Sequence, residues 1–484
     1  LFIGIFILWK QYHTLRFTEL WAAARATVAD NGGEFPLWLT WAGLCIFGGT
    51  VGKSAQFGLH IWLPDAMAGP TPVSAMIHAA TMVAAGVFLL GRTYPLLSPT
   101  VLAVVTTVGA TTALFAATIG TTCFDLKAVL AYSTISQLGF MVAAVGLGGV
   151  VPGMFHMTTH AFFKACLFLS AGSVIHGCHH VQDMRLMGGL RKKMPITFAC
   201  MLVCTLAIAG IPLFSGFYSK DKIIQAGFLK ILDAHTFDGW SLYATVALSL
   251  AAALTAFYMF RLIFLTFFGE YRGNLKEHRY SAMLAAEGVE GPDPNEHAAH
   301  ADEHGEAHHG GHAVEHGHEG GHHDHGHAQH APAQKHEAHV VHAAAHAEHG
   351  HGEHHAHEPH ESPAVMTIAL AILGFLGIFG GHFWLIAPHT AWSGHPWFET
   401  LVTLPSMYGA EIAEWIAPTL TGDALHHHED VHHLAHLCAV AVSLTVALSG
   451  IALSWFLYMK RKDLPAKVAG FLGLHITPCG QMRA

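Results

Sequence analysis

The chain has 484 residues, of which 52% are hydrophobic and only 12% are charged, and its formal net charge is −9. Its mean hydropathy is positive. This composition excludes an ordinary soluble protein of such length and indicates that most of the surface faces lipid.

Nine apolar stretches are long enough to cross a bilayer core of about 30 Å, which takes about 20 helical residues. A tenth, Leu1–Trp9, is expected to end a helix whose start is missing, because the sequence has neither an initiator Met nor a signal-peptide pattern. The predicted fold class is all-α, a polytopic membrane protein of about nine complete transmembrane helices plus a truncated first one. The stretches are 38–62, 73–97, 100–122, 127–148, 151–176, 196–229, 239–268, 364–386 and 434–459.

Composition divides the chain into five parts. Residues 1–37 hold the end of the truncated helix and an outer loop, and 38–270 hold the main block of apolar helices. An insertion rich in Ala, Gly, His, Asp and Glu follows at 271–362, then two C-terminal transmembrane helices with an intervening outer loop at 363–460, and a cytoplasmic tail at 461–484. The insertion holds over half of the 43 His and has no apolar periodicity, so we predict that it is disordered.

The histidine-rich insertion has two interpretations. It is either a store for Zn, Ni or Cu, which neutral imidazole binds well, or a solvated segment with incidental metal affinity. Irregular spacing of the histidines favours the interpretation as a solvated segment, and we interpret a later histidine cluster in the same way. The eight cysteines show no paired CxxC spacing, so we expect neither an iron–sulfur cluster nor a zinc ribbon in this chain. The later cluster consists of His426, His427, His428, His432, His433 and His436.

Lys and Arg collect in three loops, at 185–193, 272–279 and 460–462, whereas 385–433 has none. By the positive-inside rule the basic loops are cytoplasmic, and the later His cluster and the loop before it are on the outer side.

Two spans combine helix breakers with a charge. The helix is expected to loosen around Gly48–Lys53 and to break around Gly210–Gly216, before Lys220. Such interruptions are tolerated at membrane depth where protein or a water-filled cavity satisfies the backbone. The two broken spans lie five spans apart, and an odd offset reverses topology, which favours an inverted repeat of five helices.

Several ionisable side chains lie inside the predicted spans. Each costs about 2.5–3.5 kcal/mol on insertion scales, and such groups usually mark an ion or proton route. His156, His160 and Lys164 recur every four residues, which places them on one helical face. The candidate set is Lys53, His78, Lys127, His156, His160, Lys164, Lys220 and Asp221, accompanied by Tyr132, Ser133, Ser136 and Gln137.

Charged residues in membrane proteins also have an ordinary structural interpretation. We interpret Lys222, Arg261 and Asp125 as snorkelling or boundary charges. The lysines of the candidate set resist this interpretation, because the spans hold no equal number of acidic residues to pair with them. Burial disfavours the charged form of a lysine, and imidazole accepts a proton at one nitrogen while donating from the other. The set therefore predicts a proton route.

Five motifs carry a family resemblance. They are GTVGKSAQFGLHIWLPDAMAGPTPVSAMIHAATMVAAGVFLL at 49–90, LKAVLAYSTISQLGFM at 126–141, HMTTHAFFKACLFLSAGSVIH at 156–176, MGGLRKKMP at 187–195 and GIPLFSGFYSKDKII at 210–224. These motifs resemble the proton-translocating antiporter-like family and, within it, the distal antiporter-like subunit of respiratory complex I. The similarity runs continuously over about 1–270 and more weakly over 363–460.

The resemblance implies an antiporter-like proton-translocation core at 38–270. Lys53 would be the pumping lysine on the first broken helix, and Lys220, with Asp221 beside it, the lysine on the second, on the route to the outer side. The family's regulatory glutamate is expected before Leu1 and its lateral helix after about residue 465. In the family, a hydrophilic axis joins these two lysines, and the residues of this chain that match it are His78, Lys127, His156, His160 and Lys164.

The same resemblance implies a proton-translocating subunit of NADH:quinone oxidoreductase, multi-pass in the inner membrane of a bacterium. It implies no cofactor in this chain, with NADH, FMN, iron–sulfur clusters and quinone used in other subunits. The implied partners are the other membrane-arm subunits, especially the neighbouring antiporter-like subunit, and membrane lipid, with no nucleic acid.

Three alternatives stay open at this point. A subunit of a Mrp-type Na⁺/H⁺ antiporter or of a membrane-bound hydrogenase would carry the same helices and lysines. A metal transporter is suggested by the His-rich insertion, but it should pair carboxylates or His within spans, where this chain has mostly lysines. A purely structural membrane subunit is the third.

Overall fold

The computed structural model describes residues 1–232, 238–272, 359–381, 423–461 and 464, with side chains described from 431 onward in the last helix. These residues belong to one compact unit, which comprises Leu1–Leu275 and Glu358–Ala484. Most of the His-rich insertion, the loop before the last helix and most of the C-terminal tail lie outside the described residues.

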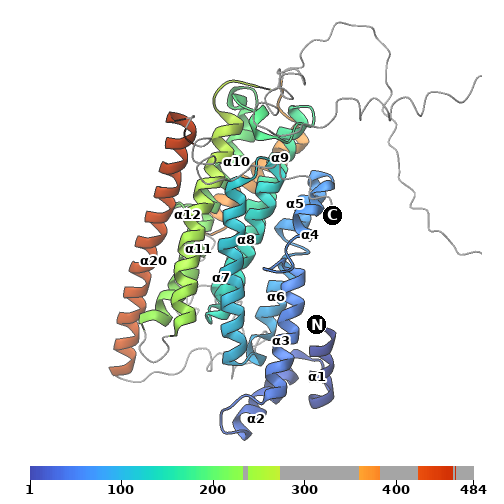
Figure 1. Cartoon of the computed structure of the whole chain (residues 1–484), viewed down its shortest axis with the longest axis vertical. Coiled ribbons are helices and arrows are strands. Elements are labelled where there is room, and N and C mark those ends of the chain that lie inside the picture. Colours follow the sequence, from blue (N-terminus) through green and yellow to red (C-terminus); the bar gives the residue numbers. More distant parts are fainter. Residues whose placement is uncertain (233–237, 273–358, 382–422, 462–463, 465–484) are drawn as a thin grey trace, which may run out of the picture. The chain divides into compact units, whose positions relative to one another are not determined.

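The described residues are helical and contain no strand (Figure 1). One isolated β-bridge joins Asp125 to Asp183. The helices are α1 (Phe2–Tyr12), α2 (Phe17–Asp30), α3 (Leu37–Lys53), α4 (Trp62–Asp65), η1 (Ala66–Ala68), α5 (Thr71–Ala79), α6 (Ala84–Thr93), η2 (Tyr94–Leu96), α7 (Pro99–Thr122), α8 (Leu126–Gly146), α9 (Val150–Gly177), η3 (Met184–Leu186), η4 (Leu190–Lys192), α10 (Pro195–Ala209), α11 (Ser215–Leu232), α12 (Gly239–Phe267), α15 (Ala364–Phe379), α20 (Asp423–Trp455) and η5 (Phe456–Lys460).

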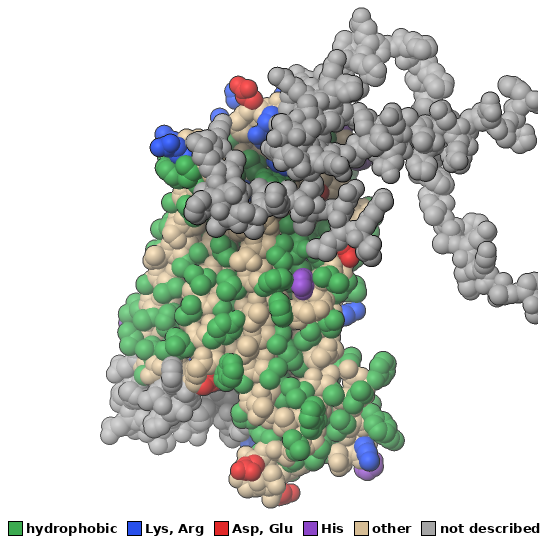
Figure 2. Space-filling view, in the orientation of Figure 1, with side chains coloured by type: hydrophobic (Ala, Val, Ile, Leu, Met, Phe, Trp, Pro, Cys, Tyr) green, Lys and Arg blue, Asp and Glu red, His purple; other side chains and the backbone are tan. Residues whose placement is uncertain are grey.

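Each of the nine apolar stretches predicted from the sequence contains helix in the described part of the chain, and three of them are interrupted. Six helical segments there are long and apolar enough to cross a membrane, and two shorter apolar helices, α10 and α15, accompany them. Figure 2 shows hydrophobic side chains over much of the visible face of these helices, with charged side chains few and scattered. The prediction of an all-helical, polytopic membrane protein is confirmed.

Helix α8 is the most deeply buried element, since all of its residues except Ala128 and Tyr132 are buried. It packs along α7, and glycines on both helices bring the two backbones together. A Cβ added at Gly109 would lie 2.5 Å from the Ala143 amide nitrogen, and one at Gly139 would lie 2.5 Å from that of Ala113. Larger side chains at these two positions would therefore force the helices apart.

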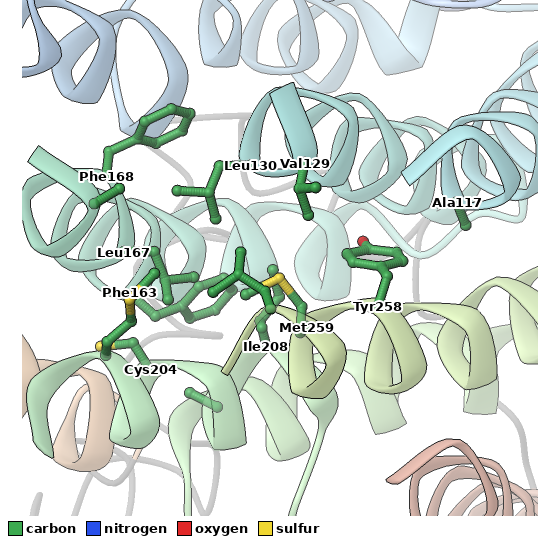
Figure 3. Packing of buried hydrophobic residues seen from close by; sticks show 14 of the residues in the cluster. Ala117, Val129, Leu130, Phe163, Leu167, Phe168, Cys204, Ile208, Tyr258 and Met259 are labelled. Atoms are coloured by element: carbon green, nitrogen blue, oxygen red, sulfur yellow. The ribbon is translucent and has the colours of Figure 1, made fainter. Parts of the chain in front are cut away.

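The main apolar core lies between α8, α9, α10 and α12. Side chains from the four helices meet there, and the same helices carry most of the candidate polar residues, so the core fixes their positions. The residues that Figure 3 labels on these helices are Val129 and Leu130 of α8, Phe163, Leu167 and Phe168 of α9, Cys204 and Ile208 of α10, and Tyr258 and Met259 of α12.

The first helix interruption lies later than the sequence suggested. Helix α3 stays helical through the glycine-rich stretch 48–52 and ends at Lys53, so the prediction that it loosens at the glycines is wrong, and Lys53 does not lie well inside its helix. Gly49 instead leaves room for Leu1, at the start of α1, because a Cβ there would lie 2.8 Å from the Leu1 Cβ. The non-helical segment follows at 54–61, where Ala55 and Gly58 have φ of 49° and 92°.

The second interruption lies where it was predicted. Helix α10 ends at Ala209, Gly210 adopts the left-handed conformation with φ 79°, and α11 begins at Ser215. A third interruption, at 80–83, separates α5 from α6 inside a stretch that the sequence analysis treated as one continuous helix.

The described residues at both ends of the His-rich insertion, 271–272 and 359–362, contact the ends of other helices, so the prediction of disorder is wrong for these residues. Arg272 donates a hydrogen bond of 2.6 Å from Nε to a carbonyl of the loop before α10. On the other side, the Glu361 carboxylate accepts from the backbone of Ile196 at 3.0 Å and of Thr197 at 3.3 Å, in the first turn of α10.

Candidate functional site

The three residues spaced by four on α9 lie on one buried face. The side chains of His156, His160 and Lys164 are 0%, 1% and 0% exposed. The prediction that they share a helix face is therefore confirmed. The three side chains form a row along α9, with 6.2 Å between the ring centroids of His156 and His160.

His156 connects α9 to the helices on both sides. Its Nε2 lies 3.1 Å from Oε1 of Gln137 on α8, and its Nδ1 lies 2.8 Å from Oγ of Ser219 on α11. Ser219 in turn lies 2.9 Å from Oγ1 of Thr159. Both nitrogens of this buried imidazole thus have polar partners, which is the arrangement that allows it to accept a proton on one side and donate on the other.

Lys164 occupies the other end of the row. Its Nζ donates to Oγ of Ser133 on α8 and lies 5.8 Å from the ring centroid of Phe168. The His78 ring, on α5, lies 4.8 Å from the same phenylalanine ring. His160 bonds to the backbone of Ala79, where α5 ends. The interruption between α5 and α6 therefore places the C-terminal end of α5 and the His78 imidazole beside the row on α9.

Lys220 lies at the break between α10 and α11. Its Nζ donates a 2.7 Å hydrogen bond to the carbonyl of Ile208, in the last turn of α10, and lies 5.1 Å from the ring centroid of Phe140. The last carbonyls of a helix lack partners within it. Because α10 ends at Ala209, no later residue of α10 can donate to the Ile208 carbonyl, and the Lys220 ammonium group donates to it instead.

Asp221 points away from the row toward α20. Its Oδ2 lies 3.3 Å from Nδ1 of His436, and its Oδ1 accepts from Oγ of Ser443 at 3.4 Å. It is 3% exposed. Neighbouring positions on a helix project about 100° apart, so Lys220 and Asp221 face different groups although they adjoin in sequence.

The structure does not join the remaining two candidates to this set. Lys127 is buried in the first turn of α8, and its Nζ donates to the carbonyls of Gly69 at 3.2 Å and Met67 at 3.4 Å, so it holds the segment before α5. Lys53 is the last residue of α3, is exposed, and makes no hydrogen bond or ion pair within the described ranges.

Two residues interpreted as boundary charges have defined positions. Asp125 caps α8, accepting from the amide of Ala128 at 2.7 Å. Arg261 does not snorkel, because it is 1% exposed and donates to the carbonyls of Thr121 at 2.9 Å and Cys123 at 2.8 Å, at the end of α7. That correction follows from the uncapped carbonyls of α7, which give a buried guanidinium its partners.

Polar residues missed by the sequence analysis complete the set. Ser219 adjoins Lys220 and follows the helix break, which was a usable signal. Tyr258 on α12 is fully buried, with its hydroxyl 3.3 Å from Thr255 Oγ1, but an isolated tyrosine in an apolar span gives no such signal. His436 belonged to a cluster interpreted as incidental.

Several buried polar atoms of the site have no protein partner in the part of the chain that the structure describes. Buried polar groups in proteins are bonded either to protein or to ordered water. Water between these side chains would satisfy the atoms and link residues that are not in direct contact. The atoms are Ser74 Oγ, both ring nitrogens of His78, Gln137 Nε2 and His160 Nε2.

The described side chains form no group of three or more His, Cys, Asp or Glu residues able to hold a metal ion. Two histidines have other polar partners instead, since His156 contacts Ser219 and Gln137 and His436 contacts Asp221. This arrangement suits proton transfer between neighbours better than metal binding.

Comparison with known proteins gives consistent results. Residues 1–258 match the family described as NADH:quinone oxidoreductase/Mrp antiporter, TM. The chain is 53% identical over 266 residues to NAD(P)H-quinone oxidoreductase chain 5 of Picosynechococcus sp., which covers 52% of this chain and 39% of the relative. It is 55% identical over 249 residues to NADH-quinone oxidoreductase subunit L of Rhodobacter capsulatus, covering 49% and 34% respectively.

The fold is also similar to that of a solved structure. A chain of the Mrp complex from Dietzia sp. DQ12-45-1b superposes with a TM-score of 0.58 and 21% identity, covering 98% of this chain and 41% of that one. At this identity the likeness concerns the fold alone. The matched region spans only 39% and 34% of the length of the two curated relatives.

Proposed function

Because the chain belongs to the NADH:quinone oxidoreductase/Mrp antiporter transmembrane family, we propose that it is a proton-translocating membrane subunit of an NADH-quinone oxidoreductase. The observation that carries the proposal is the buried row on α9, in which His156 is bonded on both sides and Lys164 has a hydroxyl partner. The names of the relatives favour this enzyme over other members of the family.

The geometry supports a stepwise route. His156 is in contact with Ser219, and the next residue of α11, Lys220, lies at the helix break, so a proton leaving the row reaches α11 there. His160 and Lys164 extend the row in the other direction, toward His78. Imidazole and hydroxyl groups pass protons along hydrogen bonds, and water bridges the longer gaps. The buried lysines are able to hold and release a proton.

Lys53 and Lys127 enter the proposal on the family resemblance. We assign Lys53 as the lysine of the first interrupted helix, because a non-helical segment begins directly after it. Lys127, which holds the segment between η1 and α5, is assigned to the cytoplasmic end of the route. Neither assignment requires the two residues to touch the row on α9, since water can bridge groups that are not in contact.

The redox chemistry belongs elsewhere in the complex. NADH, FMN, iron–sulfur clusters and quinone are proposed to act in other subunits, and this chain contributes the proton movement that quinone reduction drives. Its partners would be the other membrane-arm subunits, especially the neighbouring antiporter-like subunit, and lipid of a bacterial inner membrane.

A second candidate is a subunit of a Mrp-type Na⁺/H⁺ antiporter, favoured by the fold likeness to a chain of the Mrp complex. The two candidates differ in what the complex needs. An oxidoreductase subunit moves protons when NADH is oxidised, without sodium, whereas an antiporter moves protons against a sodium gradient.

The test uses the complete complex in sealed inverted membrane vesicles. His160→Ala and Lys164→Met should each slow NADH-driven proton pumping at least about tenfold, because general acid–base steps contribute about 10²–10⁴-fold to rates. His176→Ala is the matched control, since His176 is on the same helix but exposed. Both variants should assemble as the parent does. Pumping at the parental rate by Lys164→Met would refute the proposed function, and so would sodium-driven proton movement without NADH.

A further inference from the structure

Asp221 on α11 contacts His436 on α20. Helix α20 packs on α11 and α12, as Figure 1 shows. His436 lies in the first half of α20. The other end of this helix continues into η5, which ends at Lys460 and packs on α12 near the basic loops. The contact between Asp221 and His436 therefore lies toward the side of the membrane opposite the basic loops.

Asp221 and His436 differ sharply in burial. The Asp221 side chain is 4% exposed, whereas that of His436 is 51% exposed, and Nδ1 of the histidine lies 3.3 Å from Oδ2 of the aspartate. A single residue pair therefore spans from the interior to the surface. The pair is also oriented, because Ser443 binds the other carboxylate oxygen from the same helix, two turns further on.

Other polar groups lie around the pair. Lys222 is the next residue on α11, and His432 and His433 precede His436 on α20. Gln225, one turn after Asp221, donates to the His432 carbonyl at 3.5 Å and so ties the two helices together nearer the surface. Ser443 and His436 both contact the Asp221 carboxylate, and of these two only the His436 side chain is half-exposed.

The chemistry of the pair suits transfer rather than storage. A carboxylate buried behind the helix surface has no route to water of its own. An imidazole whose Nδ1 faces the carboxyl group can take up a proton there and lose one from Nε2. A flip of the half-exposed ring then turns its unprotonated nitrogen toward Asp221, ready for the next proton.

We propose that His436 is the outer terminus of the proton route, a residue that accepts protons from Asp221 and releases them on the side opposite the basic loops. The inference rests on the proposed function. In one step, the O–H bond of protonated Asp221 breaks and a bond to Nδ1 of neutral His436 forms, leaving a carboxylate and an imidazolium. The imidazolium then loses its Nε2 proton to water, so charge and protons balance.

The experiment uses the complete complex in sealed inverted vesicles, where the outer face lines the lumen. His436→Ala should lower the NADH-driven membrane potential and the coupled rate of quinone reduction at least about tenfold, with electron transfer to an artificial acceptor unchanged. His433→Ala is the matched control, because it removes an exposed imidazole three residues away on the same helix. That control should behave as the parent.

Two further measurements separate proton transfer from a structural ion pair. Imidazole added to the vesicles crosses the membrane in its neutral form and should restore the quinone reduction rate of His436→Ala, but not that of Lys164→Met. His436→Lys keeps a positive charge beside Asp221, yet an exposed lysine with a pKa of about 10.4 releases protons slowly near neutral pH, so it should remain impaired. A parental rate in His436→Lys, or no rescue by imidazole, would overturn the inference.

The outcomes also distinguish this inference from the proposed function. If Lys164→Met loses pumping while His436→Ala pumps at the parental rate, only the assignment of His436 fails. If Lys164→Met pumps at the parental rate, the proposed function itself fails.

Discussion

Two buried lysines of the proposed route, Lys164 and Lys220, differ in whether their hydrogen-bond acceptor has another partner. This difference predicts that variants with the same transport defect will differ in stability. Lys164 donates to Ser133, whose hydroxyl also donates to the Leu130 carbonyl at 2.9 Å. Lys164→Met therefore leaves no orphaned group at that site. Lys220 donates to the Ile208 carbonyl, which has no other recorded partner among the described residues.

The magnitude follows from this difference. Methionine is about as long as lysine, and both substitutions remove the cost of burying an ammonium group away from water. That contribution is common to both variants. An orphaned buried carbonyl costs about 1–3 kcal/mol, and the loss of a cation at a helix C-terminus adds to it. Lys220→Met should therefore be less stable than Lys164→Met by about 1–3 kcal/mol.

Thermal unfolding of the detergent-purified complexes measures the difference. At one scan rate, since unfolding of large assemblies is usually irreversible, the midpoint of Lys220→Met should lie several degrees below that of Lys164→Met. Both variants should lose proton pumping in vesicles. Equal midpoints, or a lower midpoint for Lys164→Met, would show that the bond to Ile208 does not stabilise the break and would refute the reasoning.

Three further predictions follow from the anchors and breaks. Deleting 273–358 should leave proton pumping in vesicles near the parental rate, and loss of pumping in an assembled deletion variant would contradict this. Glu361→Ala removes the cap of α10 and should lower the free energy of unfolding by about 0.5–2 kcal/mol, seen as a lower unfolding midpoint. Gly139→Leu should prevent assembly, judged by native gel, because even a Cβ there would lie 2.5 Å from the Ala113 amide nitrogen. Lys53→Arg should pump nearly as poorly as Lys53→Ala, because guanidinium stays protonated; a parental rate would make Lys53 a fixed electrostatic element.

Periodicity and composition predicted the features that depend on local sequence. The apolar stretches gave the helices, and the four-residue spacing placed His156, His160 and Lys164 on one face, because helix geometry alone decides which side chains are neighbours. The break at Gly210 was also predictable, since a glycine there adopts a left-handed conformation that ends α10.

Features that depend on packing between distant segments were not predictable. The glycines of 48–52 are compatible with helix, and Gly49 leaves room for Leu1, so the break falls after Lys53 instead. Glu361 caps a helix that begins 166 positions earlier, at Pro195. His436 meets Asp221 across 215 positions, and nothing local distinguishes it from the other histidines of its cluster.

The central claim is that buried imidazole carries protons between α8, α9 and α11, and His156 tests it most directly. His156→Gln keeps a side chain able to bond to Gln137 and Ser219 but cannot take up a proton near neutral pH. The measurement is the number of protons moved per NADH oxidised in sealed vesicles, with assembly checked by native gel. The account predicts a lower ratio than that of the parent. An unchanged ratio in a fully assembled complex would contradict it.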